Sequence, residues 1–212
     1  REPVPMKQLP GTVLWAATGG LPAGSRVEYQ LETRLCEHYE RFNDPLNPRV
    51  ANSPLGSSSV CAGEGYHIPR WTRADHEARA GELSEHHIRS KALRRDQRYL
   101  IYTPARFNTV LRYPLLVVHD GPEYVQFAAM RTVLDNLIHN LDIAPMVVAF
   151  VPPGDRLREY ANFAPHARFL ARELVPAIEE RYPLVETSGS RCLMGSSFGG
   201  VAAVSTAYRY PG

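Results

Sequence analysis

The sequence predicts an α/β fold in which a doubly wound, mostly parallel sheet follows a small antiparallel β-sandwich. Three observations support it: alternating apolar and polar residues before residue 50, a Ser-, Gly- and Pro-rich stretch after it, and apolar runs alternating with amphipathic segments from residue 83. Parallel neighbours need long crossovers, which such alternation supplies. We therefore expect a sandwich domain over 1–50, a linker over 51–82 and an α/β domain over 83–212.

The first 50 residues have the pattern of short strands joined by turns. Residues 27–33 alternate with period two, which predicts a sheet with one solvent-facing side. Residues 42–49 combine Asn, Asp and Pro, which is turn chemistry. For the aromatic residues of this region, packing in the core is favoured over a sugar-binding face. These residues are Trp15, Tyr29, Tyr39 and Phe42.

From residue 83 the pattern becomes that of an α/β domain. Spacings of three and four predict one helix over 127–141 and a second over 169–182. The second helix is expected to be bent or interrupted at Pro176, because proline has no N–H. The first two predicted strands form an antiparallel pair, whereas the next two are covered on both faces. These four strands are 84–91, 97–103, 114–119 and 146–151.

The stretch most informative about chemistry is the pentapeptide 195–199, Gly-Ser-Ser-Phe-Gly. An apolar run precedes it and small residues at helical spacing follow, which predicts a strand, a tight turn and a helix. At such a turn Ser197 is strained and its hydroxyl projects from the sheet edge, while Gly195 and Gly199 avoid a Cβ clash. Ser197 is the candidate nucleophile, with an idle serine in a glycine-rich turn as the alternative.

Composition excludes several classes of function. With 24 basic and 22 acidic residues, the net charge of +2 gives no reason to expect nucleic acid, and the basic cluster 89–98 is interpreted as a solvated face. Three cysteines without metal-ligand spacing favour a reducing, cytoplasmic location. No run approaches the roughly 18 apolar residues of a membrane span, and the N-terminus has no signal-peptide pattern. We expect no metal and no organic cofactor.

Residues 83–212 resemble the enterochelin-esterase-like esterases of the α/β-hydrolase superfamily, also called the esterase D group. Three segments carry the resemblance: 113–121, 169–182 and 195–200. Residues 1–50, through the turn at 43–49, look like the immunoglobulin-like N-terminal domain of such esterases. The resemblance implies an α/β-hydrolase sheet that is incomplete at its C-terminus, preceded by that domain.

The resemblance also implies serine-esterase chemistry. Ser197 would attack an ester carbonyl and form an acyl-enzyme, and the backbone N–H of Phe198 would donate to the oxyanion. The second donor is expected after the strand 114–119. Because Pro122 has no N–H, Gly121 or Glu123 would supply it, and Gly121 is our choice.

Two further residues resemble the family's Arg-x-x-Glu segment, which implies a place beside the substrate pocket. These are Arg156 and Glu159, and an Arg–Glu pair that only fixes the loop is the equal alternative.

The histidines are assigned no catalytic role. His119 ends a buried strand ahead of the nucleophile, so a structural role is favoured over a catalytic one. His139 and His166 are predicted to lie at the surface. His86 and His87 alternate on one strand and cannot both face one metal ion.

In α/β-hydrolases the catalytic acid and histidine follow the serine. No Asp, Glu or His follows Ser197 here, so we expect a fragment of a longer esterase that is inactive alone. The predicted function is hydrolysis of a small-molecule carboxylic ester, including a siderophore ester. The alternatives are an acyltransferase of the mycolyltransferase type and a non-catalytic carbohydrate-binding or interaction module. The sequence does not indicate an oligomeric state.

Overall fold

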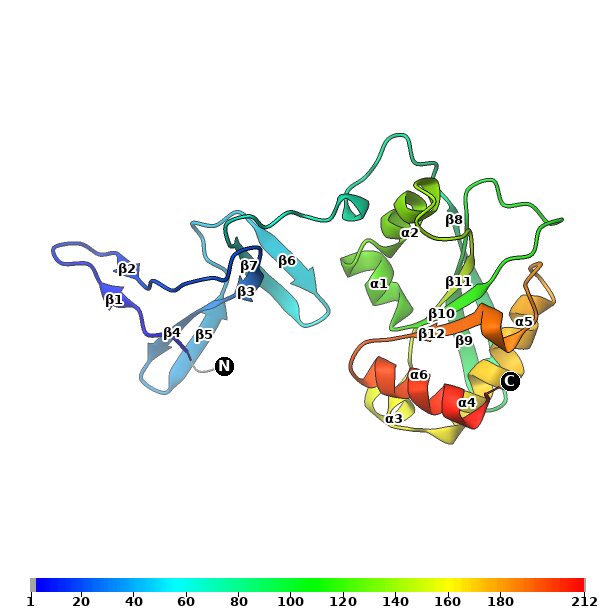
Figure 1. The fold of residues 1–212 in the computed structure, drawn as a ribbon. Helices are drawn as coiled ribbons and strands as arrows, with labels where there is room; N and C mark the ends of the chain where they lie inside the picture. Colours follow the sequence, from blue (N-terminus) through cyan, green and yellow to red (C-terminus); the bar gives the residue numbers. More distant parts are fainter. Residues whose placement is uncertain (1–2, 212) are drawn as a thin grey trace. The chain divides into compact units, whose positions relative to one another are not determined.

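The computed structural model describes residues 3–211 and divides into two compact units, residues 1–68 and 69–212 (Figure 1). The first unit is all β. Its sheets are β1–β2, β4–β5 and β3–β7–β6, and every pairing is antiparallel. The strands are β1 (Lys7–Gln8), β2 (Trp15–Ala16), β3 (Arg26–Tyr29), β4 (Leu31–Leu35), β5 (His38–Phe42), β6 (Val50–Ser53) and β7 (Gly56–Ala62).

The predicted linker is wrong for residues 51–62, because β6 and β7 occupy them. Strand β7 carries serines where a core strand carries apolar side chains, so it has no apolar periodicity to detect. Its serine hydroxyls accept hydrogen bonds from the turn at 43–47 instead: Ser57 from Asn43 Nδ2 at 2.7 Å and Ser59 from the Asp44 N–H at 2.8 Å. Polar contacts thus replace apolar ones there.

The aromatic residues of the first unit are only partly interior. Tyr29 is half-buried and donates its hydroxyl to Asp44 Oδ2 at 2.7 Å. By contrast, Trp15 is 60% exposed and Tyr39 is 66% exposed, so core packing is wrong for these two. The immunoglobulin-like sandwich stays a prediction.

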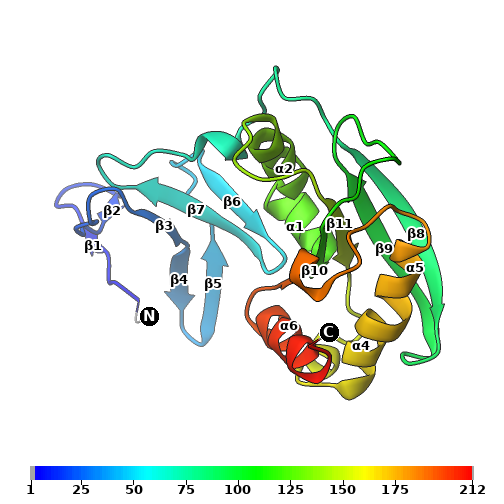
Figure 2. The same ribbon diagram turned by 45° about the vertical axis from the view of Figure 1, so that its right-hand side comes forward.

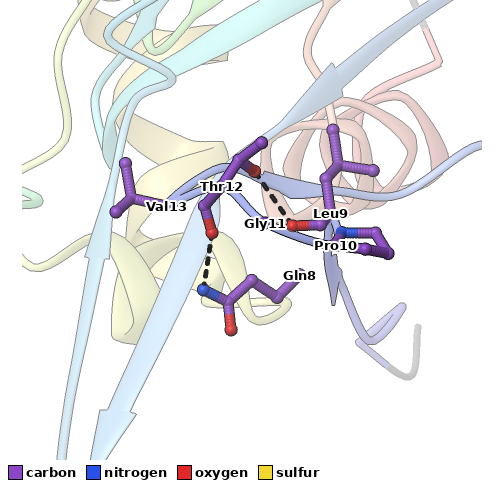
Figure 3. A pocket seen from close by; sticks show the side chains of 6 residues that line it. All are labelled: Gln8, Leu9, Pro10, Gly11, Thr12 and Val13. Atoms are coloured by element: carbon purple, nitrogen blue, oxygen red, sulfur yellow. Dashed lines mark hydrogen bonds between the residues drawn. The ribbon is translucent and has the colours of Figure 1, made fainter.

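A hollow of about 510 Å³ lies along the β1–β2 turn and is lined by residues 8–13 (Figure 3). Gln8 Nε2 donates to the Thr12 carbonyl at 2.8 Å, and Thr12 Oγ1 donates to the Leu9 carbonyl at 3.0 Å. None of the lining side chains is titratable. The hollow therefore offers no acid, base or charged ligand.

The second unit is built on one mixed sheet with the order β12–β10–β11–β9–β8. Its central strand pairs are parallel, β10 with β12 and with β11, whereas β9 is antiparallel to both β11 and β8. The predicted antiparallel pair of the first two strands is confirmed as β8–β9, but the sheet as a whole is mixed and not mostly parallel. The strands are β8 (Glu82–Ser90), β9 (Arg95–Thr103), β10 (Leu115–His119), β11 (Val147–Val151) and β12 (Arg191–Met194).

Helices cover both faces of this sheet, with α1 and α2 on one face and α4, α5 and α6 on the other (Figure 2). The predicted helix 127–141 corresponds to α2 alone. Ala129, with a left-handed φ of 48°, separates it from α1, which ends at Phe127 and was not predicted. At Pro176 the helix is not broken but changes type: a π-helical turn, Leu170–Leu174, lies between α4 and α5, and the backbone stays helical through Val175. The α-helices are α1 (Gly121–Phe127), α2 (Met130–His139), α3 (Arg156–Tyr160), α4 (Ala164–Phe169), α5 (Val175–Glu179) and α6 (Phe198–Arg209).

Strand β11 shows how the core is divided. Every one of its residues is buried. Val147, Ala149 and Val151 pack with Phe169 of α4, and Val148 and Phe150 pack with Leu134 of α2. The prediction that this strand is covered on both faces is confirmed.

Asp135 is a buried polar anchor between α2 and the start of β8. Its Oδ1 accepts the Tyr102 hydroxyl at 2.8 Å and the Gly81 N–H at 2.7 Å. Burial, and then the bond to Asp135, raise the pKa of Tyr102.

We predict that Asp135→Ala lowers the free energy of unfolding by about 2–4 kcal/mol, because it leaves two buried donors without an acceptor. Asp135→Asn keeps an acceptor oxygen and is the matched control. Urea unfolding in a Trp15→Phe background, where Trp71 reports on the second unit, measures both. An alanine variant no less stable than the asparagine variant would show that the anchor contributes nothing.

Candidate active site

Ser197 lies in the turn between β12 and α6 with φ 54° and ψ −122°, a combination that L-residues rarely adopt. Its side chain is exposed, and among residues 3–211 no side chain or backbone group hydrogen-bonds its hydroxyl. The strained turn between strand and helix, predicted from the pentapeptide, is present. The surrounding structure must hold this conformation.

Three glycines around Ser197 allow α6 to approach the sheet. A Cβ on Gly195 would overlap the backbone of Gly199 in the first turn of α6, and one on Gly200 would lie 3.3 Å from the Gly195 carbonyl oxygen. A Cβ on Gly199 would lie 3.2 Å from Asp120 Oδ2. The turn therefore packs backbone against backbone, and it touches the residue that follows β10.

The N–H of Phe198 is the first amide of α6. The amides of Gly199, Gly200 and Val201 donate to the carbonyls of Ser196 and Ser197, whereas the Phe198 N–H has no acceptor among residues 3–211. A free amide at the start of a twelve-residue helix is suited to a developing negative charge, because the helix dipole adds to its partial positive charge.

The N–H groups of Gly121 and Glu123, the two candidates for the second oxyanion donor, differ in their hydrogen bonding. The Glu123 N–H donates to the Asp120 carbonyl at 3.1 Å and is therefore occupied. The Gly121 N–H has no acceptor within the described part of the chain. Gly121 is also sterically required, since a Cβ there would overlap the backbone of Phe150.

Arg156 and Glu159 do not pair with each other. Arg156 forms a two-pronged ion pair with Asp120, from Nε to Oδ1 at 2.8 Å and from Nη2 to Oδ2 at 2.9 Å. The hydrogen bonds to Asp120 raise the pKa of the Arg156 guanidinium. The Arg156–Glu159 pair considered as the alternative is absent.

Glu159 is buried and bonded on both oxygens. It forms an ion pair with Arg95 and accepts the N–H groups of Gly154 at 3.1 Å and Asp155 at 3.3 Å. Burial would raise the pKa of Glu159, but Arg95 and the two amides outweigh it and hold this pKa below its ordinary value. Glu159 therefore fixes the loop after β11, and substrate contact by Arg156 or Glu159 stays a prediction.

The Arg95–Glu159 ion pair shows that the basic cluster 89–98 is not one solvated face. Arg95, which belongs to that cluster, is half-buried and faces Glu159. Arg89 and Arg98 are exposed and pair with Asp96 and Glu85.

His119 and His166 form a buried pair beneath the turn. His119 is fully buried and its Nδ1 donates to the Met194 carbonyl at 3.0 Å, which places the proton on Nδ1. The predicted surface position of His166 is wrong, because it is 2% exposed and its ring packs on His119 and Tyr160. The sequence does contain a signal for this burial: His166 lies three residues before Phe169 and therefore on the same apolar stripe of the helix.

The described residues supply few other candidates. Residues 3–211 contain no group of three His, Cys, Asp or Glu side chains that could hold a metal ion. In that range no helix is long and apolar enough to cross a bilayer.

We predict that Gly195→Ala destabilises the second unit by about 3 kcal/mol, because the added Cβ meets backbone atoms that cannot move aside. Gly189→Ala is the control, since a Cβ at Gly189 meets nothing within 4 Å. Thermal unfolding compares the two variants. Equal melting temperatures would contradict the close approach of α6 to β12.

A second prediction concerns acid stability. Burial and the neighbouring His119 lower the pKa of His166 to about 4, against an ordinary value of 6.5. The unfolded chain thus takes up the proton first, so stability falls as pH drops from about 6.5 to 4, by up to about 3 kcal/mol. His166→Phe should flatten this fall in urea unfolding at pH 7 and pH 4.5. An unchanged pH dependence would exclude His166 as its source.

Comparison with known proteins gives a consistent result. Residues 90–212 match the model of a family described as "Putative esterase". The uncharacterized protein YjcH of Bacillus subtilis is 28% identical over 138 residues, which cover 62% of this chain and 58% of YjcH. The iron(III) enterobactin esterase of Escherichia coli K12 is 24% identical over an alignment of 239 positions, which covers 99% of this chain and 58% of that protein.

Solved structures show the same fold. The enterobactin esterase of Shigella flexneri, determined in the presence of enterobactin, superposes with a TM-score of 0.80 at 23% identity, over 97% of this chain and 58% of that one. The chain thus spans about 58% of the length of these relatives. Because the family model matches more than half of the sequence, the chain belongs to the family described as "Putative esterase".

Proposed function

We propose that the protein carrying this chain hydrolyses a carboxylic ester through Ser197. The observation that carries the proposal is the combination at one turn of a strained, exposed serine and the unbonded N–H of Phe198. An oxyanion needs a donor beside the attacking oxygen, and the residue after the nucleophile provides one in this type of turn. Membership of an esterase family supports the same chemistry.

The proposed reaction proceeds in two steps. A base takes the Ser197 proton, Oγ bonds to the ester carbonyl carbon, and the carbonyl electrons move onto oxygen, which Phe198 and Gly121 stabilise by their N–H groups. The alkoxy group leaves with a proton, and an acyl-serine remains. Water then adds to the acyl carbon by the same route and releases the acid with free Ser197.

The base is the part of this mechanism that residues 3–211 do not supply. His119 is committed to the Met194 carbonyl and fully buried, and His166 is buried among aromatic rings. The relatives are longer than this chain. The proposal therefore concerns the whole protein, in which we expect a histidine to approach Ser197.

For the substrate, we propose a siderophore ester. The support is the printed function of a relative, an iron(III) enterobactin esterase, together with a similar structure determined in the presence of enterobactin. The fold alone accommodates other esters.

We predict that Ser197→Ala in the full-length protein removes turnover of a p-nitrophenyl ester down to the residual rate given by oxyanion stabilisation alone. Ser196→Ala is the matched control, because Ser196 precedes Ser197, is exposed and uses only its backbone carbonyl in the turn. Release of p-nitrophenol measures both. Unchanged turnover by the Ser197 variant, or equal loss in both variants, would refute Ser197 as the nucleophile.

A further inference from the structure

Asp120 connects the two loops of the proposed active site. It follows β10, it precedes Gly121, and its Oδ2 lies 3.2 Å from the place that a Cβ of Gly199 would occupy in the first turn of α6. Its φ of 53° is left-handed, a conformation that Asp adopts more readily than most residues, although at a cost. Something must therefore hold Asp120 there.

Each polar group of Asp120 is bonded. Its N–H donates to the Tyr160 hydroxyl at 2.9 Å. Its carbonyl accepts the amides of Glu123 and Tyr124 at 3.1 and 3.2 Å, and its carboxylate forms the two-pronged pair with Arg156. The Tyr160 ring also lies under the Arg156 guanidinium at 5.6 Å and against His119 at 5.2 Å.

These bonds determine the direction of the neighbouring amide. The peptide unit joining Asp120 to Gly121 is planar, so its N–H points away from its carbonyl. Because that carbonyl is held by the first turn of α1, the Gly121 N–H is aimed in the opposite direction. Fixing Asp120 therefore fixes the Gly121 amide.

The charge of Asp120 creates a second requirement. A bare carboxylate at the first turn of α6 would repel the negative oxygen that forms beside the Phe198 N–H. Asp120 is 8% exposed, so water screens it poorly. The guanidinium of Arg156 neutralises it through two hydrogen bonds, the strong planar geometry of such pairs.

We propose that Arg156, Asp120 and Tyr160 form a positioning clamp that orients the Gly121 amide for the oxyanion and cancels the carboxylate charge beside it. This inference rests on the proposed esterase function. It assigns Arg156 a role through Asp120 in place of direct substrate binding. None of the three residues needs to touch substrate.

The test compares Arg156→Gln, Asp120→Asn with Arg156→Gln, and Arg158→Gln in the full-length protein. Arg158 is the matched control, since it lies in the same helix and is exposed, and its guanidinium lies over the Phe163 ring at 5.1 Å. For a neutral p-nitrophenyl ester, Arg156→Gln should lower kcat about tenfold or more with little change in KM. The double variant should recover the part of that loss caused by the bare carboxylate, because asparagine tolerates the left-handed backbone and carries no charge, while the part caused by the missing Arg156 contacts stays.

A substrate-binding role gives a different result: Arg156→Gln would raise KM for anionic esters selectively, and Asp120→Asn would rescue nothing. That result would overturn the clamp. So would an unchanged kcat in the Arg156 variant.

A second readout needs no turnover, and so separates failure of the clamp from failure of the proposed function. The order parameter of the ¹⁵N-labelled Gly121 amide should fall from about 0.85 to below about 0.6 in Arg156→Gln and stay high in Arg158→Gln. If Gly121 stays rigid in both variants, the clamp is refuted whether or not the protein hydrolyses esters. If Gly121 loosens in a protein whose Ser197 is inert, the clamp stands and the esterase proposal fails.

Discussion

The structure of the second unit depends on one constraint, the close approach of α6 to the ends of β10 and β12. Gly195 and Gly199 make backbone contact possible there, and Ser197 is strained as a result. A strained residue persists only where its surroundings over-determine it. Here the surroundings are the buried sheet on one side and the Asp120 carboxylate on the other.

Two buried carboxylates near this approach, those of Asp120 and Glu159, each form an ion pair with one arginine. Asp120 is held by Arg156 and Glu159 by Arg95; Asp120 directly follows β10, and Glu159 lies in α3, the helix that follows β11. Burying an unpaired carboxylate would cost free energy, and these ion pairs offset that cost. The two acids can therefore be buried in a closely packed region. Ligands of open α/β sheets bind at the carboxyl ends of the strands.

The sequence predicted the parts of this arrangement that depend on local pattern. The buried strands β10 and β11 and the turn at Ser197 follow from apolar runs and glycine spacing, which act over a few residues. The partners of Arg156 and Glu159 could not be predicted, because they lie 36 and 64 residues away and the topology alone brings them together. His166 could have been placed correctly, because the signal for it is local. It lies three residues before Phe169, so helical spacing puts both side chains on the same buried stripe.

Strand β7 shows another limit of pattern analysis. Its serines form hydrogen bonds with the turn at 43–47, so the strand forms without an apolar repeat. Composition alone made this stretch resemble a linker. The antiparallel β8–β9 pair was predicted, but the antiparallel pairing of β9 with β11, which joins this pair to the parallel strands, has no local sequence pattern that would reveal it.

The central claim is that the amides of Phe198 and Gly121 together receive the oxyanion of a Ser197 adduct. A crystal structure of the full-length protein treated with an ester-mimicking phosphonate tests it most directly. We predict phosphorus bonded to Ser197 Oγ, with one phosphonyl oxygen within about 2.7–3.1 Å of both amide nitrogens. A phosphonyl oxygen that contacts neither amide, or an adduct on Ser196, would contradict it.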